Sequence, residues 1–356
     1  MNPTNKTLPF VSLVLPVRNE ATYMARCLRA VLFQDYPLDR MEIIVADGMS
    51  DDGTREILNT IRRQSPQLLR LIDNPGRIVS TGLNAAIPKA SGEIIIRIDG
   101  HCEIERDYVS CCVRHLVEDG FDGVGGPLET IGETPTAETI AIAMGSPFGV
   151  GNSGFRTSKS TNDTPDTIPF PAYTRSIIER AGPYDEDLVR NQDDDYNYRL
   201  RSLGAKLLLA ADVRSRYFSR GSVRSLWRQY FQYGYFKIRV LQKQPKQMRA
   251  RQFVPPMFAA ALLLGLVMTP FTSIARWSLG LLMASYLVCN LTASVLTALR
   301  KRPSLPLLLP IVFATIHLAY GFGFLFGFVV FRSQWTERTT RNPTVPWLST
   351  KLSGPA

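Results

Sequence analysis

Apolar segments that run into polar loops fill the first hundred residues, and they restrict the chain to a small set of folds. Each of three segments reads as a buried strand followed by a carboxylate, namely 11–17 with Glu20, 43–46 with Asp47, and 94–98 with Asp99. Helical patterns follow at 21–33, 54–64 and 79–89, with one more short strand expected at 69–72. Such alternation predicts an α/β fold with a mostly parallel sheet. Because open α/β sheets bind ligands at the carboxyl ends of their strands, the polar loops mark the expected site.

The hydrophobic content of 45% is concentrated after residue 252. Three stretches there are almost free of charge, at 253–271, 277–299 and 305–331. Each is close to the roughly 20 residues that span a bilayer. We therefore expect a membrane domain at 253–331 with two to three segments, preceded by a basic juxtamembrane segment at 236–252 and followed by a polar tail at 332–356. Prolines and glycines in the third stretch leave open whether it crosses fully or is broken.

The net charge of +10 has a clear location, because eleven Arg and Lys residues lie between 214 and 251 without an Asp or Glu among them. We call these residues, from Arg214 to Arg251, the basic collar. A basic run beside a membrane segment is typical of contact with anionic lipid and of a cytoplasmic orientation. No nucleic-acid motif accompanies it, so nucleic acid is not expected as a partner. The predicted location is the cytoplasmic (inner) membrane, multi-pass, with the first domain facing the cytoplasm.

Two further segments bear on function. Residues 127–171 are rich in Gly, Ser, Thr, Pro and Asn, which predicts a long and mobile active-site loop. A helix is expected at 186–203, with Asn191-Gln192-Asp193-Asp194-Asp195 in its N-terminal part and Asp195 paired with Arg199 at i,i+4. The five cysteines show no zinc spacing and predict reduced thiols in a cytosolic domain.

Four motifs together resemble the family 2 glycosyltransferases of GT-A fold, over roughly residues 10–235. Residues 16–20 look like the P-x-x-N-E opening of that family, and 47–54 like its D-G-S-x-D-G-T motif. Asn84 with Ala90-x-Gly92 looks like the approach to its metal motif, and 182–186 like G-G-F-D-E. The resemblance implies a cytoplasmic catalytic domain at 1–235 with a Rossmann-like, mostly parallel sheet, followed by C-terminal transmembrane helices.

The resemblance also implies roles for individual residues. Asp99 and His101 stand where the family has D-x-D, so they are the expected ligands of a divalent cation, Mg²⁺ or Mn²⁺, beside the donor pyrophosphate. Asp47 is expected to accept a hydrogen bond from the uracil N3–H, with Pro16 and Glu20 shaping the nucleoside pocket. The alternative for Asp47 is that it only caps the next helix.

Asp193 is the expected general base, because it stands in register with the E-D-x-D motif of the family, although Gln192 replaces the Glu. The alternative is a solvated acidic turn at a helix start. Gln229-Tyr230-Phe231-Gln232-Tyr233 partly resembles the Q-x-x-R-W motif of polysaccharide synthases. Contacts with acceptor or pyrophosphate are therefore open to Asp195, Trp227, Arg228 and Gln229, while an amphipathic helix at the membrane surface explains the last three equally well.

The implied activity is inverting transfer of a sugar from a UDP-sugar to a polyprenyl-diphosphate-linked glycan. The segments R-x-D-x-H at 97–101 and N-Q-D-D at 191–194 look most similar to bacterial exopolysaccharide glucosyltransferases of the succinoglycan type, which implies UDP-glucose. The alternatives are a polyprenyl-phosphate sugar transferase, a processive polysaccharide synthase, and a non-catalytic membrane scaffold of the same fold. Sugar, linkage, metal and oligomeric state are left open by the sequence.

Overall fold

The computed structural model describes residues 8–151, 153–157, 160–161 and 165–335. These residues form two compact units. The first unit takes in the chain up to Leu128 and the segment that ends at Tyr217, and the second takes in the segment from Glu129 and everything described from Phe218 onward. Each unit has its own core and is described by itself.

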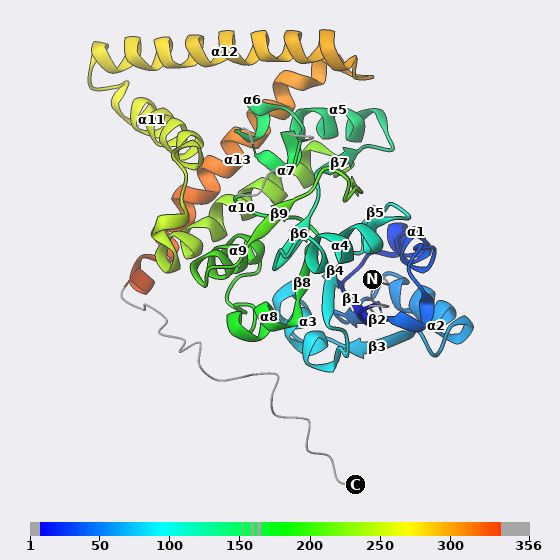
Figure 1. Cartoon of the computed structure of the whole chain (residues 1–356). Helices are drawn as coiled ribbons and strands as arrows, with labels where there is room; N and C mark the ends of the chain where they lie inside the picture. The colour runs from blue at the N-terminus through cyan, green and yellow to red at the C-terminus, as the bar shows by residue number, and fades with distance from the viewer. Residues whose placement is uncertain (1–7, 152, 158–159, 162–164, 336–356) are drawn as a thin grey trace. The chain divides into compact units, whose positions relative to one another are not determined.

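The first unit is built on a seven-stranded sheet (Figure 1). In sheet order its strands are β3 Leu69–Asp73, β2 Met41–Asp47, β1 Val11–Val17, β4 Ile94–Arg97, β8 Ala172–Thr174, β6 Gly123–Gly125 and β9 Leu207–Leu209. β3, β2, β1 and β4 run parallel, β8 is antiparallel to β4 and β6, and β6 and β9 are parallel. Every residue of β1 and β2 is buried, as expected for strands covered on both faces. The predicted mostly parallel sheet is confirmed.

Helices surround this sheet, at α1 Ala21–Leu32, α2 Thr54–Gln64, α3 Val79–Ala86, α4 Tyr108–Val117, α8 Arg175–Ala181 and α9 Gln192–Ser202. Two short 3-10 turns, Leu38–Arg40 and Ile87–Lys89, link helices to strands. A small antiparallel pair joins β5 Cys102–Ile104 to β10 Ser215–Phe218, with Tyr217 opposite Cys102. The helices predicted after the first three strands are confirmed to within a few residues.

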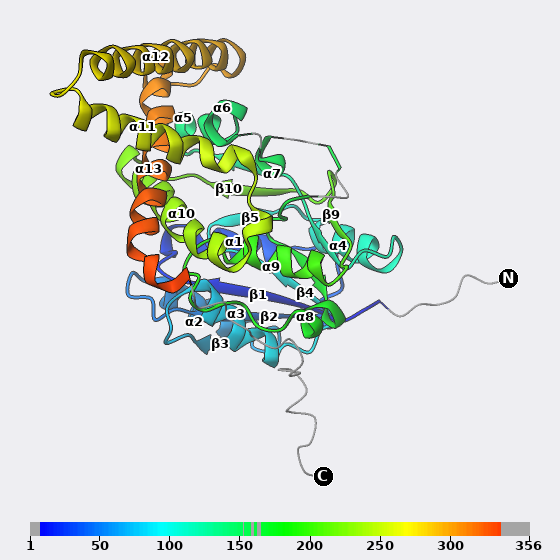
Figure 2. The ribbon, with the colours of Figure 1, turned by 90° about the vertical axis from the view of Figure 1, so that its left-hand side faces the viewer.

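The strand register aligns the loops that the sequence marked as the site. In the strand register, Val17 of β1 lies opposite Asp47 of β2, and Asp47 lies opposite Asp73 of β3, so the three strands end at the same level. β4 runs beside β1 in the same direction and ends at Arg97 (Figure 2). The polar residues that follow these four strands therefore lie along one edge of the sheet, which is where ligands of parallel sheets bind.

The helix predicted at 186–203 begins six residues later than expected. Asn191 has a left-handed backbone with φ 62, and α9 begins at Gln192 directly after it. The residues before it form a turn in which the N–H of Asp187 donates to Asp185 Oδ1. Asn tolerates the left-handed region better than most residues, which permits the abrupt start. The three aspartates 193–195 thus fill the first turn of α9, where the helix dipole favours negative charge.

The prediction of one long loop at 127–171 was wrong over most of its length. The described part contains β7 Leu128–Ile131 and three helices, α5 Pro135–Met144, α6 Pro147–Val150 and α7 Gly154–Thr157. Thr134 and Ser146 cap α5 and α6, and each cap is followed by a proline at the start of the helix. Ser, Thr and Pro are favoured at these positions of a helix start. The same residue types are common in loops, which explains the wrong prediction. Residues 152, 158–159 and 162–164 of this stretch lie outside the described residues.

The second unit is helical after residue 218, with α10 Val223–Lys243, α11 Val254–Met268, α12 Ser273–Lys301 and α13 Leu309–Val330. Short 3-10 turns lie at Pro245–Gln247, Ala250–Phe253, Pro306–Leu308 and Arg332–Trp335. By length and composition, Ala250–Met268, Ser273–Lys301 and Pro306–Val330 are able to cross a membrane. They coincide with the three predicted apolar stretches. Of the predicted tail, residues 336–356 lie outside the described residues.

The third apolar stretch forms one unbroken helix, so the broken alternative is wrong for α13. Pro310 lies in the first turn, where no intrahelical N–H is needed. The glycines provide close packing instead of a break, because a Cβ at Gly323 would lie 2.1 Å from the carbonyl oxygen of Phe231 in α10. A Cβ at Gly327 would likewise lie 2.5 Å from that of Tyr235.

The predicted boundary at residue 235 falls inside α10, which continues without interruption to Lys243. Two members of the basic collar, Lys237 and Arg239, are buried within the second unit. Arg239 donates to Gln242 Oε1 at 2.7 Å and lies over the ring of Phe331. Amphipathic packing of α10 on α13 therefore removes these two charges from the surface that the collar was expected to offer to lipid.

Candidate active site

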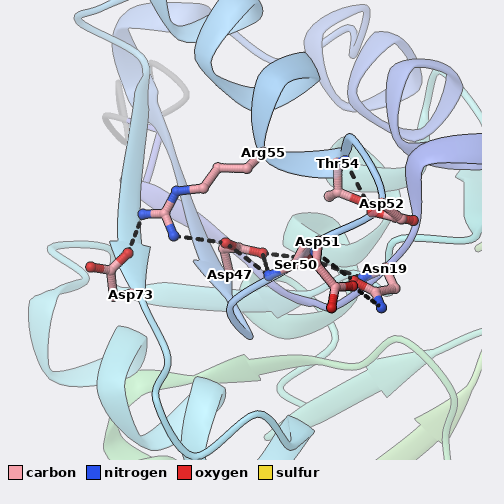
Figure 3. A network of polar contacts seen from close by, with 8 residues as sticks. All are labelled: Asn19, Asp47, Ser50, Asp51, Asp52, Thr54, Arg55 and Asp73. Atoms are coloured by element: carbon pink, nitrogen blue, oxygen red, sulfur yellow. Dashed lines mark hydrogen bonds and ion pairs between the residues drawn. The ribbon is translucent and has the colours of Figure 1, made fainter.

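Reciprocal hydrogen bonds join the loops that follow β1 and β2 (Figure 3). Asn19 Nδ2 donates to Asp51 Oδ1 at 2.8 Å, and the N–H of Asp51 donates back to Asn19 Oδ1 at 3.1 Å. The N–H of Asn19 also donates to Ser50 Oγ at 3.0 Å. Asn19 adopts a left-handed backbone with φ 55, which turns its amide toward the second loop.

Asp52 caps the N-termini of both neighbouring helices, α1 and α2. Its Oδ2 accepts the N–H of Ala21 in α1, and its Oδ1 accepts the N–H and hydroxyl of Thr54 in α2. Burial alone would raise the pKa of Asp52, but the bonds from Thr54 and Ala21 hold it below its ordinary value. The Thr54 hydroxyl in turn accepts the N–H of Glu20 at 2.8 Å. Asp52 therefore does the capping, and the side chains of Asp47 and Glu20 are not used for it.

Asp47, at the end of β2, is fully buried and fixed by two neighbours. Its Oδ1 accepts the hydroxyl of Ser50 at 2.6 Å, and its Oδ2 accepts Arg55 Nη1 at 3.1 Å. Arg55 also pairs with Asp73 at the end of β3, as Figure 3 shows. The bond to Asp73 raises the pKa of Arg55 above its ordinary value. The carboxyl group of Asp47 is thus held in one orientation at the edge of the sheet, and its predicted contact with a base N–H stays a prediction.

Arg97 brings together the predicted metal ligand and the predicted base. It ends β4, is 5% exposed, and donates from Nε to Asp99 Oδ1 at 3.0 Å. Its Nη2 lies 2.9 Å from the same oxygen, and its Nη1 donates to Asp193 Oδ1 in the first turn of α9. Burial would lower the pKa of Arg97, but the two carboxylates hold it above its ordinary value. One buried guanidinium therefore links two carboxylates that lie 94 positions apart in the sequence.

The Asp193 carboxyl has an environment suited to proton transfer near neutral pH. Burial raises its pKa to about 6, the positive charge of Arg97 opposes that rise, and Asp99 and Asp194 add to it. The main-chain carbonyl of Asp193 accepts Asn197 Nδ2 at 2.9 Å, and Asn197 itself is held by the hydroxyl of Tyr173 in β8. α9 therefore presents Asp193 from a fixed first turn.

His101 and Glu20 form a second pair, with His101 Nδ1 at 2.7 Å from Glu20 Oε1. Both side chains are largely buried, and the ring of Tyr217 meets the imidazole edge to face at 5.0 Å. The glycine between Asp99 and His101 permits this contact, because a Cβ at Gly100 would lie 2.9 Å from Glu20 Cγ. The structure thus places the Glu20 carboxylate against the metal motif.

Asp195 is buried and forms an ion pair with Arg199. Its Oδ2 lies 3.3 Å from Arg199 Nε in the next turn of α9, as the i,i+4 spacing predicted. Arg199 also donates to the carbonyls of Ala181 and Pro183, both at 2.9 Å. This pair fastens α9 to the loop after α8, and its predicted contact with acceptor or pyrophosphate stays a prediction.

The remaining predicted residues lie in varied settings. Pro16 is buried in β1, where a Cβ at Gly82 of α3 would lie 3.1 Å from Pro16 Cβ. In the second unit, Gln229 is buried and donates to the Tyr233 hydroxyl at 3.0 Å, while Trp227 is partly exposed. The contacts proposed for Trp227, Arg228 and Gln229 stay predictions.

No role in the site was predicted for Arg97, Arg55 or Ser50, although Arg97 begins the R-x-D-x-H segment. A charged residue inside the apolar run 94–98 was the available signal for Arg97, because a strand buried on both faces seldom carries an arginine without carboxylate partners. Arg55 and Ser50 carried no such signal, since both stand in a polar loop and helix start where such residues are common.

The residues near Asp99 fit a divalent cation that is bound together with a nucleotide. Within the described ranges, no three His, Cys, Asp or Glu side chains gather into a metal site. Mg²⁺ in nucleotide enzymes usually has only one or two protein ligands, with substrate phosphates and water completing its shell. Asp99 and His101, the predicted pair, would supply two such ligands, one oxygen and one nitrogen. The arrangement is therefore suited to an ion that the donor completes.

The chain is similar to known glycosyltransferases. Residues 12–182 match the model of glycosyl transferase family 2, which includes the loops after β1, β2 and β4. A glucuronosyltransferase of Methanococcus voltae named for its dolichyl N-acetyl-α-D-glucosaminyl phosphate substrate is 25% identical over 327 residues, covering 90% of this chain and 97% of its own. The succinoglycan biosynthesis protein ExoA of Rhizobium meliloti is 27% identical over 314 residues, covering 88% and 93%.

Among solved structures, the mannosyltransferase PcManGT of Pyrobaculum calidifontis, in complex with GDP-mannose and Mn²⁺, superposes with a TM-score of 0.55. The two chains are 20% identical, and the match covers 90% of this chain and 89% of that one. This similarity confirms the predicted GT-A fold. The family match, together with the named relatives, identifies residues 12–182 as a glycosyl transferase family 2 domain and the chain as a glycosyltransferase, in which this domain is followed by three helices able, by length and composition, to cross a membrane.

Proposed function

We propose that this enzyme transfers a sugar, with inversion, from a UDP-sugar to a lipid-linked glycan, and that Asp193 is the general base. The observation that carries the proposal is the contact of Arg97 with both Asp99 and Asp193. It keeps a candidate metal ligand and a candidate base within reach of one guanidinium, as a displacement between a diphosphate leaving group and an attacking hydroxyl requires.

The reaction follows from these positions. The acceptor hydroxyl gives its proton to a carboxylate oxygen of Asp193, and its oxygen attacks the anomeric carbon of the donor sugar. The bond from that carbon to the diphosphate oxygen breaks, and UDP leaves with the electron pair. With a pKa of about 6, Asp193 is mostly ionised at neutral pH and still basic enough to take the proton.

Asp99 and His101 would hold a divalent cation, Mg²⁺ or Mn²⁺, at the diphosphate. Such an ion, when bound, neutralises the negative charge that builds up on the leaving group. The related mannosyltransferase structure holds Mn²⁺, which supports a divalent cation here. Arg97 keeps Asp99 oriented, since both of its bonds to Asp99 end on Oδ1.

The donor and acceptor are proposed from several lines of support. Asp47, fixed by Ser50 and Arg55, is suited to accept the N3–H of uracil. The name of ExoA supports a role in polysaccharide synthesis of the succinoglycan type. Glucose is proposed from the resemblance of residues 97–101 and 191–194 to glucosyltransferases of that type. The name of the Methanococcus relative supports a lipid-linked acceptor, for which we propose a polyprenyl-diphosphate glycan. The mannosyltransferase binds GDP-mannose, so the base of the donor must be tested directly.

The three apolar helices would keep the enzyme beside an acceptor that stays in the bilayer. We propose a multi-pass protein of the cytoplasmic membrane whose first unit faces the cytoplasm, because the exposed members of the basic collar precede α11 and because Arg300 and Lys301 end α12 and Arg302 follows it directly. Anionic lipid headgroups would contact the exposed collar residues.

The first test is UDP release by the full-length protein in detergent with membrane lipid extract. The donors are UDP-glucose, other UDP-sugars and GDP-mannose, each with Mg²⁺ or Mn²⁺. Asp193→Asn is expected to lower turnover about 10²- to 10⁴-fold, the usual contribution of a general base. Asp194→Asn, one residue along the same helix turn, is the matched control and is expected to keep most of the activity.

Three outcomes contradict parts of the proposal. Equal turnover by wild type and Asp193→Asn would show that Asp193 is not the general base. Release of GDP in preference to UDP would overturn the donor assignment. A product carrying many added sugars would indicate the processive synthase. A product with the sugar on a polyprenyl monophosphate would indicate the polyprenyl-phosphate sugar transferase.

A further inference from the structure

Glu20 contacts the metal motif and takes no part in capping α1. Its N–H is bound by the Thr54 hydroxyl, and the first free N–H of α1, on Ala21, is bound by Asp52. Both bonds come from the loop after β2, so the Glu20 side chain is released from the role that a carboxylate at this position usually fills. It extends to His101, 81 residues further along the chain, at 2.7 Å.

This contact determines which nitrogen of His101 can bind an ion. A carboxylate only accepts hydrogen bonds, so the hydrogen of the neutral imidazole is on Nδ1 and its lone pair is on Nε2. Metal-binding histidines are commonly oriented in this way, with a carboxylate on the other ring nitrogen. Tyr217 packs against the edge of the ring and limits its rotation.

Gly100 makes the arrangement sterically possible. A Cβ at this position would lie 2.9 Å from Glu20 Cγ and 3.1 Å from Val17 Cγ1. Any larger residue between Asp99 and His101 would push Glu20 away from the imidazole. The residues Glu20, Gly100 and His101 therefore act as one unit, although they come from the ends of β1 and β4.

We propose that Glu20 is a positioning residue that orients His101 as a nitrogen ligand, and that the Asp99–His101 pair thereby selects Mn²⁺ over Mg²⁺. This rests on the proposed function only in that the ion is bound together with UDP. Mg²⁺ is a hard cation that takes oxygen ligands in near-ideal octahedral geometry. Mg²⁺ holds an imidazole nitrogen poorly, whereas Mn²⁺ accepts one beside its oxygen ligands, so an oxygen-plus-nitrogen pair favours Mn²⁺ over Mg²⁺.

The test measures metal binding directly, with the full-length protein in detergent, Mn²⁺ and UDP as probes. Bound Mn²⁺ is quantified by electron paramagnetic resonance, and Mg²⁺ is added as a competitor. Wild type is expected to bind Mn²⁺ at least ten-fold more tightly than Mg²⁺. Glu20→Gln is expected to weaken Mn²⁺ binding about 10- to 100-fold, the usual effect of losing an outer carboxylate. Gly100→Ala, which keeps both side chains, is expected to weaken it in the same direction.

Two further variants make the test selective. His101→Asp supplies an oxygen ligand in place of nitrogen and is expected to lower the Mn²⁺ to Mg²⁺ preference several-fold without abolishing binding. Glu103→Gln removes a carboxylate two residues along the chain, which pairs with Arg26 at 3.6 Å, and is expected to leave the preference unchanged. UDP binding in EDTA is expected to be the same for wild type and Glu20→Gln.

The results separate this inference from the proposed function. Unchanged Mn²⁺ affinity in Glu20→Gln, or an unchanged metal preference in His101→Asp, would overturn the inference even if UDP-sugar turnover were normal. Weaker UDP binding by Glu20→Gln in EDTA would mean that Glu20 serves the nucleoside instead. If the metal preference follows the expected pattern while no UDP-sugar is turned over, the inference stands and the donor assignment fails.

Discussion

Replacement of Arg97 by Met gives the sharpest test of the site, because this residue touches both carboxylates on which the mechanism depends. The guanidinium is 6% exposed at its side chain, so little solvent screens its charge. A unit charge about 4 Å away contributes about 4 kcal/mol at an effective dielectric constant near 20. That energy corresponds to about 3 pKa units at 1.36 kcal/mol per unit. The carboxylate of Asp193 is 35% exposed, so we expect the lower part of a one- to three-unit range.

The sign follows from the charge that is lost. Arg97 lowers the pKa of Asp193, so its removal raises that pKa from about 6 to between about 7 and 8. A base must be ionised to act, so the acidic limb of the pH profile of kcat/KM moves upward by the same amount. At pH 7 turnover falls about ten-fold if the pKa reaches about 8, and part of the activity returns as the pH rises above the new pKa.

The control is Arg175→Met, which removes an arginine that donates to the carbonyls of Ala90 and Gly92 and contacts neither carboxylate. It is expected to lower stability without moving the pH profile. Adding Asp193→Asn to Arg97→Met is expected to restore part of the melting temperature lost in the single variant, since it removes an unpaired carboxylate. An acidic limb that stays at the wild-type pH in Arg97→Met would refute the reasoning.

Two further predictions concern packing and stability, measured as thermal unfolding in detergent. Arg199→Met removes the arginine from the ion pair of the buried Asp195 and is expected to cost about 3–5 kcal/mol, partly recovered by adding Asp195→Asn. An unchanged melting temperature would show that the pair is not needed. Gly323→Val forces a side chain into the carbonyl of Phe231 and is expected to cost about 1–3 kcal/mol of stability. The control is Gly280→Val, where a Cβ meets nothing within 4 Å, and it is expected to be neutral. Equal effects of the two valines would contradict the close packing of α10 and α13.

Local sequence patterns were a reliable guide wherever burial on two faces or a bilayer dictated them. The runs that form β1, β2 and β4 are continuous and apolar, and the three stretches after residue 252 match helices of spanning length. Sequence patterns led to wrong predictions where the same residue types are common both in loops and at helix starts. Ser, Thr and Pro in 127–171 suggested a loop, yet they start helices α5 and α6, and a helix expected from residue 186 begins at Gln192. Only the hydrogen-bonded backbone distinguishes a cap from a turn.

The sequence by itself determined the α/β alternation, the strand-end carboxylates and the apolar helices, because these depend on spacing between neighbours along the chain. The tertiary structure alone decided which of those polar groups meet. Arg97 reaches Asp193 across 96 residues, and Glu20 reaches His101 across 81, through contacts that no local spacing encodes. Strand order and register bring these loops to one edge of the sheet. Burial there places the charged side chains in direct contact, so that the pKa of Asp193 depends on Arg97 and the orientation of each side chain depends on its partner.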